Sequence, residues 1–138
     1  MSTAAPPDAA AASTLFIDRD LWSRRLDAAL REAGIPFVAH RDLFAGDTPD
    51  VEWIAEVGRR GWVVLTRDQE IRRRPNELAA VRAARIHLFA LTSGNLSADE
   101  TATLCVAAWP AVQRAVSRHT APAIFSITRG GRVEWLKS

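Results

Sequence analysis

The sequence predicts an α/β domain with a mainly parallel sheet flanked by helices and a C-terminal β-hairpin. Short apolar runs alternate with amphipathic helical segments, as in the strand–helix units that build parallel sheets. The run from Trp62 to Thr66 is continuous and rich in β-branched residues, as expected of a central strand buried on both faces. Near the end of the chain, Gly130 and Gly131 separate two further strand-like runs and predict a hairpin turn.

Capping and turn residues place the individual elements. Asp20 is a plausible N-cap for the first helix, and Gly34 is expected to end that helix. Gly61 stops the second helix, and Ser97 with Glu100 forms a capping box that opens the last one. In chain order we expect strands at 15–17, 36–40, 62–66, 86–91, 124–129 and 132–136, and helices at about 20–33, 49–60, 75–85 and 97–118.

The composition limits the classes of function. Lys and Arg total 18 against 16 Asp and Glu, so nucleic-acid binding must be argued from local clusters of arginine rather than from net charge. The single cysteine, Cys105, excludes an internal disulfide framework and a multi-cysteine zinc site, and its apolar helical setting predicts a small core residue. The histidines lack the close spacing of a zinc pair; they are His40, His87 and His119.

The start of the chain has the composition of a leader rather than of a folded segment. Residues 1–13 are rich in alanine, and no Lys or Arg occurs before Arg19. Because a secretory signal needs a basic segment ahead of its apolar one, we interpret 1–13 as a disordered leader before a domain spanning 14–138. No run approaches the roughly 18 apolar residues of a membrane span. We therefore expect a cytoplasmic protein.

Three aspartates are expected at one edge of the sheet. Asp18 directly follows the first strand, and Asp68 follows the third strand after one intervening arginine. Asp50 lies in the first turn of a helix, on the face that also carries Trp53 and Val57 and that turns toward the sheet. Ligands of parallel α/β sheets bind beyond the carboxyl ends of the strands. The three carboxylates should therefore converge there.

Converging carboxylates must be neutralised, because a close pair costs about 4 kcal/mol at an effective dielectric constant near 20. Mg²⁺ or Mn²⁺ does this with oxygen ligands and can activate a water against a phosphodiester. Each acid also has a purely structural explanation. Asp50 favours the helix dipole, Asp18 could cap the first helix, and Asp68 could pair with Arg72. The shared location of the three favours a metal site.

Three segments resemble PIN-like domains of the VapC-toxin type, and the resemblance covers roughly residues 15–136. They read FIDRDL, DLFAGDTPDVEWIAEVGRRGWVVLTRDQEIRRRP and LFALTSGNL. The resemblance implies a ribonuclease that depends on Mg²⁺ or Mn²⁺ and acts as the toxin of a toxin–antitoxin pair. It further implies an RNA substrate, an antitoxin protein as partner and a homodimer.

The resemblance also assigns residues. Asp18, Asp50 and Asp68 match the acids of the first strand, the helix and the next buried strand, and would hold the metal and serve catalysis. Many PIN domains place a fourth acid after a later strand, where this chain has Asn95. Asn95 could ligate through its amide oxygen or orient the attacking water, and Asp20 could compensate as a metal ligand.

The arginines beside Asp68 suggest an RNA-binding surface. A cationic loop next to an anionic metal site suits a binder of the phosphate backbone. The same loop could instead be a solvated surface or the docking surface for an antitoxin. The residues concerned are Arg67, Arg72, Arg73 and Arg74.

Two other classes fit parts of the sequence. The D-x-D from Asp18 to Asp20 follows an apolar strand, as in phosphatases of the haloacid dehalogenase type, and Thr66 or Thr92 could supply their strand-end hydroxyl. However, no later acidic pair follows, no lysine precedes Lys137, and the chain is short for that fold. The second alternative is a PIN-like module that docks a protein or RNA without cutting, which would fit the missing fourth acid.

Overall fold

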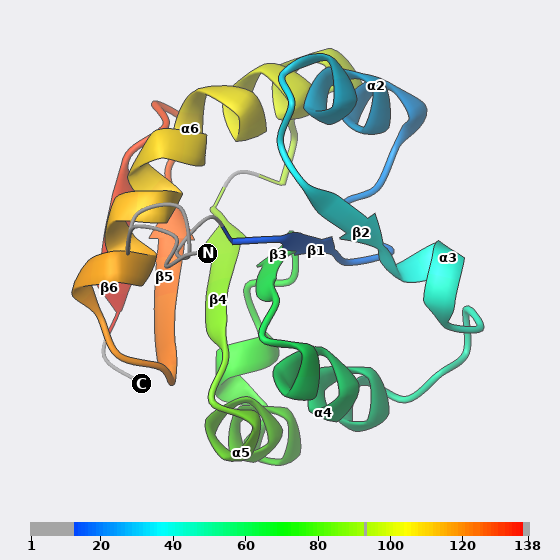
Figure 1. Ribbon diagram of the computed structural model, residues 1–138, viewed down its shortest axis with the longest axis vertical. Coiled ribbons are helices and arrows are strands. Elements are labelled where there is room, and N and C mark those ends of the chain that lie inside the picture. Colours follow the sequence, from blue (N-terminus) through cyan, green and yellow to red (C-terminus); the bar gives the residue numbers. More distant parts are fainter. Residues whose placement is uncertain (1–12, 93, 137–138) are drawn as a thin grey trace, which may run out of the picture.

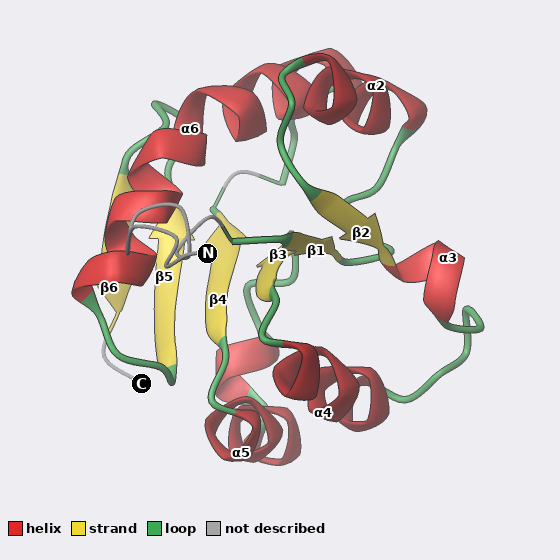
Figure 2. Cartoon of the chain, viewed as in Figure 1, coloured by secondary structure: helices red, strands yellow, loops and turns green. Residues whose placement is uncertain are grey.

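Strands and helices alternate along the described chain, residues 13–92 and 94–136 of a computed structural model (Figures 1 and 2). Residues 1–12 of the expected leader lie outside the described residues. The elements are β1 (Leu15–Ile17), α2 (Arg24–Glu32), β2 (Phe37–Ala39), α3 (His40–Leu43), α4 (Asp50–Arg60), β3 (Val63–Thr66), the 3₁₀ helix η1 (Ile71–Arg73), α5 (Pro75–Ala84), β4 (His87–Leu91), α6 (Ala98–Arg118), β5 (Ala123–Ile127) and β6 (Val133–Leu136).

The strands form one six-stranded sheet in the order β2-β1-β3-β4-β5-β6. The first five strands of that order pair in parallel, and β6 pairs antiparallel with β5. This confirms the predicted mainly parallel sheet with its C-terminal hairpin. Because β1 and β3 are neighbours, the residues that follow them come together at one edge of the sheet.

Helices cover both faces of the sheet, α2 and α6 on one side and α4 and α5 on the other (Figure 1). The strand side chains alternate between two apolar cores, so Ile17 packs toward α2 and α6 while Phe16 packs toward α4 and Trp53. Gly58 lets α4 approach α5 closely, since a Cβ at this position would lie 2.5 Å from the Cβ of Ala84. Cys105 is buried in the core under α6, as predicted.

The first helix begins later than the sequence suggested, and the N-cap prediction for Asp20 is wrong. Ser23 is the N-cap, and its side chain accepts a hydrogen bond from the Leu26 amide. The chain from Asp18 to Trp22 forms a turn in which the amides of Leu21 and Trp22 donate to the Asp18 carbonyl. The Asp18 carboxylate is therefore not used as a helix cap.

Two short helices occur where loops were expected. In α3 the side chain of His40 is buried, and in η1 the side chain of Ile71 enters the core beside Val81. None of the described helices combines the length and apolar character needed to cross a membrane.

Candidate metal and nucleic-acid site

Asp18 lies buried at the carboxyl end of β1, with 5% of its surface exposed. Its amide donates to the Leu65 carbonyl of β3 at 3.0 Å, which holds it between the two strands. The carboxylate accepts hydrogen bonds from the Thr66 hydroxyl at 2.7 Å and from the Arg19 amide at 2.7 Å. Burial raises the pKa of Asp18 from 3.8 to about 6; the Thr66 hydrogen bond opposes this rise, whereas the nearby charge of Asp20 adds to it.

Thr66 connects Asp18 to Asp68. Its hydroxyl donates to Asp18 and accepts a hydrogen bond from the Asp68 amide at 3.0 Å. The Asp68 carboxylate also accepts from the Glu70 amide at 3.0 Å, so the start of the loop after β3 is fixed by local bonds. The hydroxyl of a strand-end threonine thus sets the relative positions of two acids that are 50 residues apart in the sequence.

Asp50 lies in the first turn of α4, as predicted. Its carboxylate accepts a hydrogen bond from Trp53 Nε1 at 2.8 Å, and the Trp53 ring is fully buried against Phe16. The register of the helix therefore determines where the carboxylate lies. Its charge also contributes to the raised pKa of Asp18, although burial is the main cause.

A third carboxylate completes a compact acidic group with Asp50 and Asp68. Glu77 belongs to the first turn of α5, and one carboxylate oxygen from each of the three residues lies within 4.8 Å of the other two. Sequence reasoning missed Glu77 because it follows a basic loop. The available signal was its place two residues after Pro75, since first-turn acids of helices that start at this edge can point toward the strand ends.

Arg74 inserts into this acidic group. Its guanidinium donates to the Asp68 carboxylate at 2.6 Å and to the Glu77 carboxylate at 2.5 Å. The bond to Glu77, with the charge of Asp68 and despite some desolvation, raises the pKa of Arg74. Asp68 thus has an arginine partner, as the structural explanation allowed, but the partner is Arg74 rather than Arg72. The acidic group therefore already has a positively charged partner, the guanidinium of Arg74.

The remaining predicted residues are spread more widely. Asp20 is exposed and pairs with Arg19 at 3.9 Å, while Asn95 is exposed in the connection between β4 and α6. Arg67 points away from Arg74, because it donates to Thr101 of α6 at 3.3 Å and its Nε is buried without a partner among the described residues. Arg72 and Arg73 lie in η1, beside Arg74.

His40 is buried at the start of α3. It is 1% exposed, and neither ring nitrogen has a hydrogen-bond partner within the described chain. The imidazole packs against Phe16, Phe44 and Trp53, with its centroid 6.0 Å from that of Trp53. Burial lowers its pKa, and the carboxylate of Asp50 only partly offsets this.

The donor set suits a hard divalent cation. Asp50, Asp68 and Glu77 offer oxygen ligands only, which are the ligands that Mg²⁺ and Mn²⁺ prefer over softer metals. Asp18 lies close enough for the charge of Asp50 to affect its pKa, so it can extend the set. Within the described residues the chain therefore provides the chemistry for the predicted metal.

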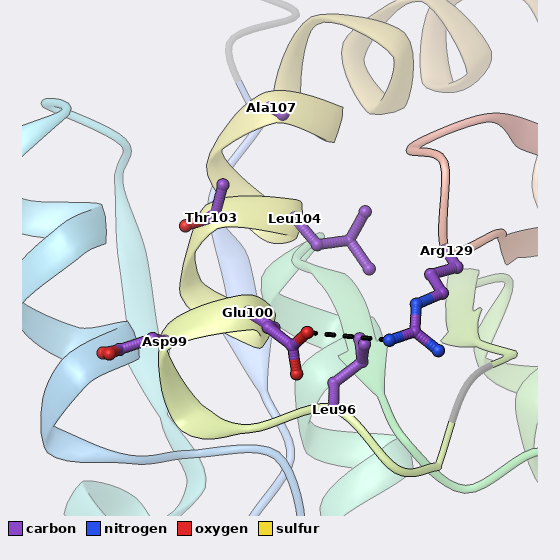
Figure 3. Close-up of a pocket in the computed structure, with 7 residues that line it drawn as sticks. All are labelled: Leu96, Asp99, Glu100, Thr103, Leu104, Ala107 and Arg129. Carbon is purple, nitrogen blue, oxygen red and sulfur yellow. Dashed lines mark ion pairs between the residues drawn. The ribbon is translucent and has the colours of Figure 1, made fainter.

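A cavity of about 330 Å³ lies elsewhere, where α6 begins. Figure 3 shows Thr103 and Leu104 of α6 on one side of it and Arg129 on the other. Glu100 pairs with Arg129 across this opening at 3.6 Å. None of the predicted metal ligands lines it, so the acidic group is separate from this cavity.

Residues 13–93, more than half of the chain, match the family described as PIN like domain. The chain therefore belongs to the PIN-like domain family. It is also similar to a protein of Mycobacterium tuberculosis (strain ATCC 25618 / H37Rv) named "Putative ribonuclease VapC45", with 28% identity over 117 residues, 82% of this chain and 84% of that protein. No solved structure matches the chain. The family assignment favours the PIN-like interpretation over a haloacid dehalogenase-type phosphatase.

Proposed function

We propose that the chain is a metal-dependent endoribonuclease and the toxin of a toxin–antitoxin pair. The observation that supports this best is the meeting of Asp50, Asp68 and Glu77 beside the buried Asp18, at the edge where a PIN-like domain is expected to act. The name of the mycobacterial relative points to the same activity. RNA is the proposed substrate, with an antitoxin protein as partner, a homodimer as assembly and the cytoplasm as location.

The acids are the proposed ligands of the cation. Asp50, Asp68 and Glu77 would hold Mg²⁺ or Mn²⁺, with Asp18 in direct contact or acting through a water. A bound cation of this kind lowers the pKa of water and neutralises charge that develops on a phosphodiester. Asp20 and Asn95, both exposed near this edge, stay candidates for orienting the attacking water or adding a ligand.

In this proposal, the arginines have different roles before and after a metal ion binds. Arg74 compensates the charge of Asp68 and Glu77 while the acids hold no metal. Once another cation neutralises those acids, Arg74 is free to pair with a phosphate next to the cleaved bond. Arg72 and Arg73 would hold neighbouring phosphates, whereas Arg67 would contribute at longer range because it is tied to Thr101.

A non-catalytic binding module is the second candidate. It is favoured by Asn95, which stands exposed where many PIN domains have an acid. Growth arrest on expression that survives the combined Asp18→Asn and Asp68→Asn changes would support this alternative. Loss of arrest in that double variant would support the ribonuclease.

Purified, partner-free protein should cleave RNA from a broad pool when Mn²⁺ is added and not in EDTA. Asp18→Asn and Asp68→Asn should each lower the cleavage rate at least about 100-fold, the scale of losing a ligand or orienting partner of a metal. Glu32→Gln is the matched control, because this acid is exposed at the end of α2 and away from the acidic group. Absence of cleavage by the unmodified protein over the whole pool would refute the proposed activity.

A further inference from the structure

A smaller cavity of about 140 Å³ is lined in part by the loop that follows Asp68. Its floor includes Ala90 of β4 and Ser126 of β5, and its rim is formed by Gln69, Arg72 and Arg73 from the connection between β3 and α5. Gln69 directly follows Asp68, so the cavity begins one residue from a proposed metal ligand. Its volume suits one planar ring rather than a drug-sized molecule, for which pockets start at roughly 300 Å³.

Ser126 is the polar group on the floor of this cavity. It is 7% exposed and interrupts the otherwise apolar strand β5. Ser126 lines the cavity, and its hydroxyl can donate one hydrogen bond and accept two. The Ser126 hydroxyl is therefore available to a group that enters the cavity.

The rim adds further hydrogen-bonding groups in a fixed place. The Gln69 side chain donates to the Thr92 carbonyl at 2.7 Å, which anchors its amide between the ends of β3 and β4. Its second amide atom, the carbonyl oxygen, has no partner in the described part of the chain and can accept a bond from a ligand. Together with Ser126, this gives the cavity both donors and acceptors, as recognition of a base edge requires.

The charge at the mouth points to an anionic ligand. Arg73 makes only a long ion pair with Glu70 at 3.4 Å. Arg72 has no ion pair or hydrogen bond within the described residues, and it is partly exposed. Guanidinium groups at the mouth of a ring-sized cavity with mixed polar and apolar walls match a nucleotide, whose phosphate stays outside while its base enters.

We propose that this cavity is a subsite for one nucleobase of single-stranded RNA, next to the cleaved phosphodiester. Ser126 and Gln69 read the edge of the base, and Arg72 and Arg73 hold its phosphates. This inference rests on the proposed ribonuclease function, and it adds a determinant of sequence preference to it.

Binding can be measured without catalysis. Short single-stranded RNAs that differ at one position are titrated in EDTA against the whole chain, and fluorescence anisotropy gives the affinity for each base. Ser126→Ala and Gln69→Ala should reduce the preference between the best and worst base about 10-fold or more, the scale of losing a hydrogen bond to a base edge. Arg72→Ala should weaken binding of all sequences alike and lower the slope of log affinity against log salt by about one.

Thr103→Ala is the control, because this hydroxyl lines the cavity of Figure 3 rather than the proposed subsite. It should leave affinity and base preference unchanged. Gln69 lies on the rim, so its variant tests the proposal even where Ser126→Ala perturbs β5.

The two proposals fail in different ways. Base-dependent binding that is lost in Ser126→Ala and Gln69→Ala supports the subsite even where no RNA is cleaved with Mn²⁺. Equal affinity of the unmodified chain for all bases, or a preference that survives both variants, overturns the subsite even where RNA is cleaved. Binding of a protein partner that both variants abolish, without any effect on RNA, would assign the cavity to that partner instead and overturn the proposal.

Discussion

Asp18 is buried, and burial is unfavourable for an ionised carboxylate. Its pKa of about 6, against an ordinary 3.8, means that folding favours the protonated acid. The resulting stabilisation is fully present below pH 4 and is lost as pH rises through 6, because the folded carboxylate must then ionise in a buried place. A shift of this size corresponds to about 3 kcal/mol. Without a cation, this residue therefore destabilises the protein at neutral pH.

Asp18→Asn removes the ionisation while keeping the shape of the side chain. In EDTA at pH 7.5 we expect its free energy of unfolding to exceed that of the unmodified protein by up to about 3 kcal/mol. At pH 4 the difference should shrink toward zero. Urea unfolding at the two pH values measures this. A difference that does not depend on pH would contradict the assigned pKa.

His40 is buried as well, and neither of its ring nitrogens has a hydrogen-bond partner among the described residues. His40→Phe replaces its two unpaired ring nitrogens by carbon within the cluster of Phe16, Phe44 and Trp53. We expect the free energy of unfolding to rise by about 1 kcal/mol, because an unsatisfied buried polar group is removed. The comparison is His87→Phe, which breaks a hydrogen bond to the His119 carbonyl at 2.6 Å and should lower stability. Thermal melts of both variants measure these changes in stability. Destabilisation by His40→Phe would mean that the His40 ring nitrogens have hydrogen-bond partners in solution.

At the scale of elements, the connection from β3 to α5 determines the state of the acidic group. Arg74 ends this connection, next to η1, and its guanidinium reaches both Asp68 and Glu77. A protein cation and a metal ion thus compete for the same carboxylates. The ion pairs are partly exposed, with 42% of the Arg74 side chain accessible, so their contribution to folding is small.

Arg74→Ala should therefore tighten Mn²⁺ binding several-fold, since the internal competitor is gone. The same variant should bind RNA more weakly, because a phosphate partner is lost. Titration with Mn²⁺ followed by electron paramagnetic resonance gives the metal affinity. Arg73→Ala is the matched control for the Mn²⁺ affinity alone, as Arg73 pairs with Glu70 outside the acidic group. Weaker Mn²⁺ binding by Arg74→Ala would show that Arg74 supports the metal site instead of competing with it.

Most elements were predictable from local signals, and the exceptions have physical causes. Buried runs and helix caps gave the six strands and the four longer helices to within a few residues. The start of α2 was misplaced because Ser23 and Asp20 are both good caps, and only the turn closed by the Asp18 carbonyl decides between them. The short helices α3 and η1 could not be foreseen, since each depends on a tertiary contact of one residue, His40 or Ile71.

The acidic residues were predictable to different degrees. Asp18 and Asp68 could be placed because each follows a predicted strand of the parallel sheet. Asp50 could be placed because the helical repeat shows which face of its helix turns toward the sheet. Glu77 was missed, since its approach to Asp68 depends on how the loop before α5 closes. Arg67 was grouped with its neighbours in sequence, but the alternation of side chains at the end of β3 turns it toward α6.

At the scale of the whole molecule, the parallel order of β1 and β3 and the N-terminal ends of α4 and α5 bring the carboxylates to one place. The formal charge of the chain is only +2, so the cationic loop beside this acidic edge matters more than the overall charge. Together, these features predict that the carboxylates form a divalent-cation site.

Binding of Mn²⁺ shows whether the carboxylates form this site. Isothermal titration of the unmodified protein at pH 7.5 should give saturable binding, with a rise in melting temperature as Mn²⁺ increases. Asp50→Asn and Asp68→Asn should each weaken binding about 10-fold or more, whereas Glu32→Gln should bind as the unmodified protein does. Equal Mn²⁺ affinity in all four proteins, or no binding by any of them, would mean that these carboxylates do not form a cation site.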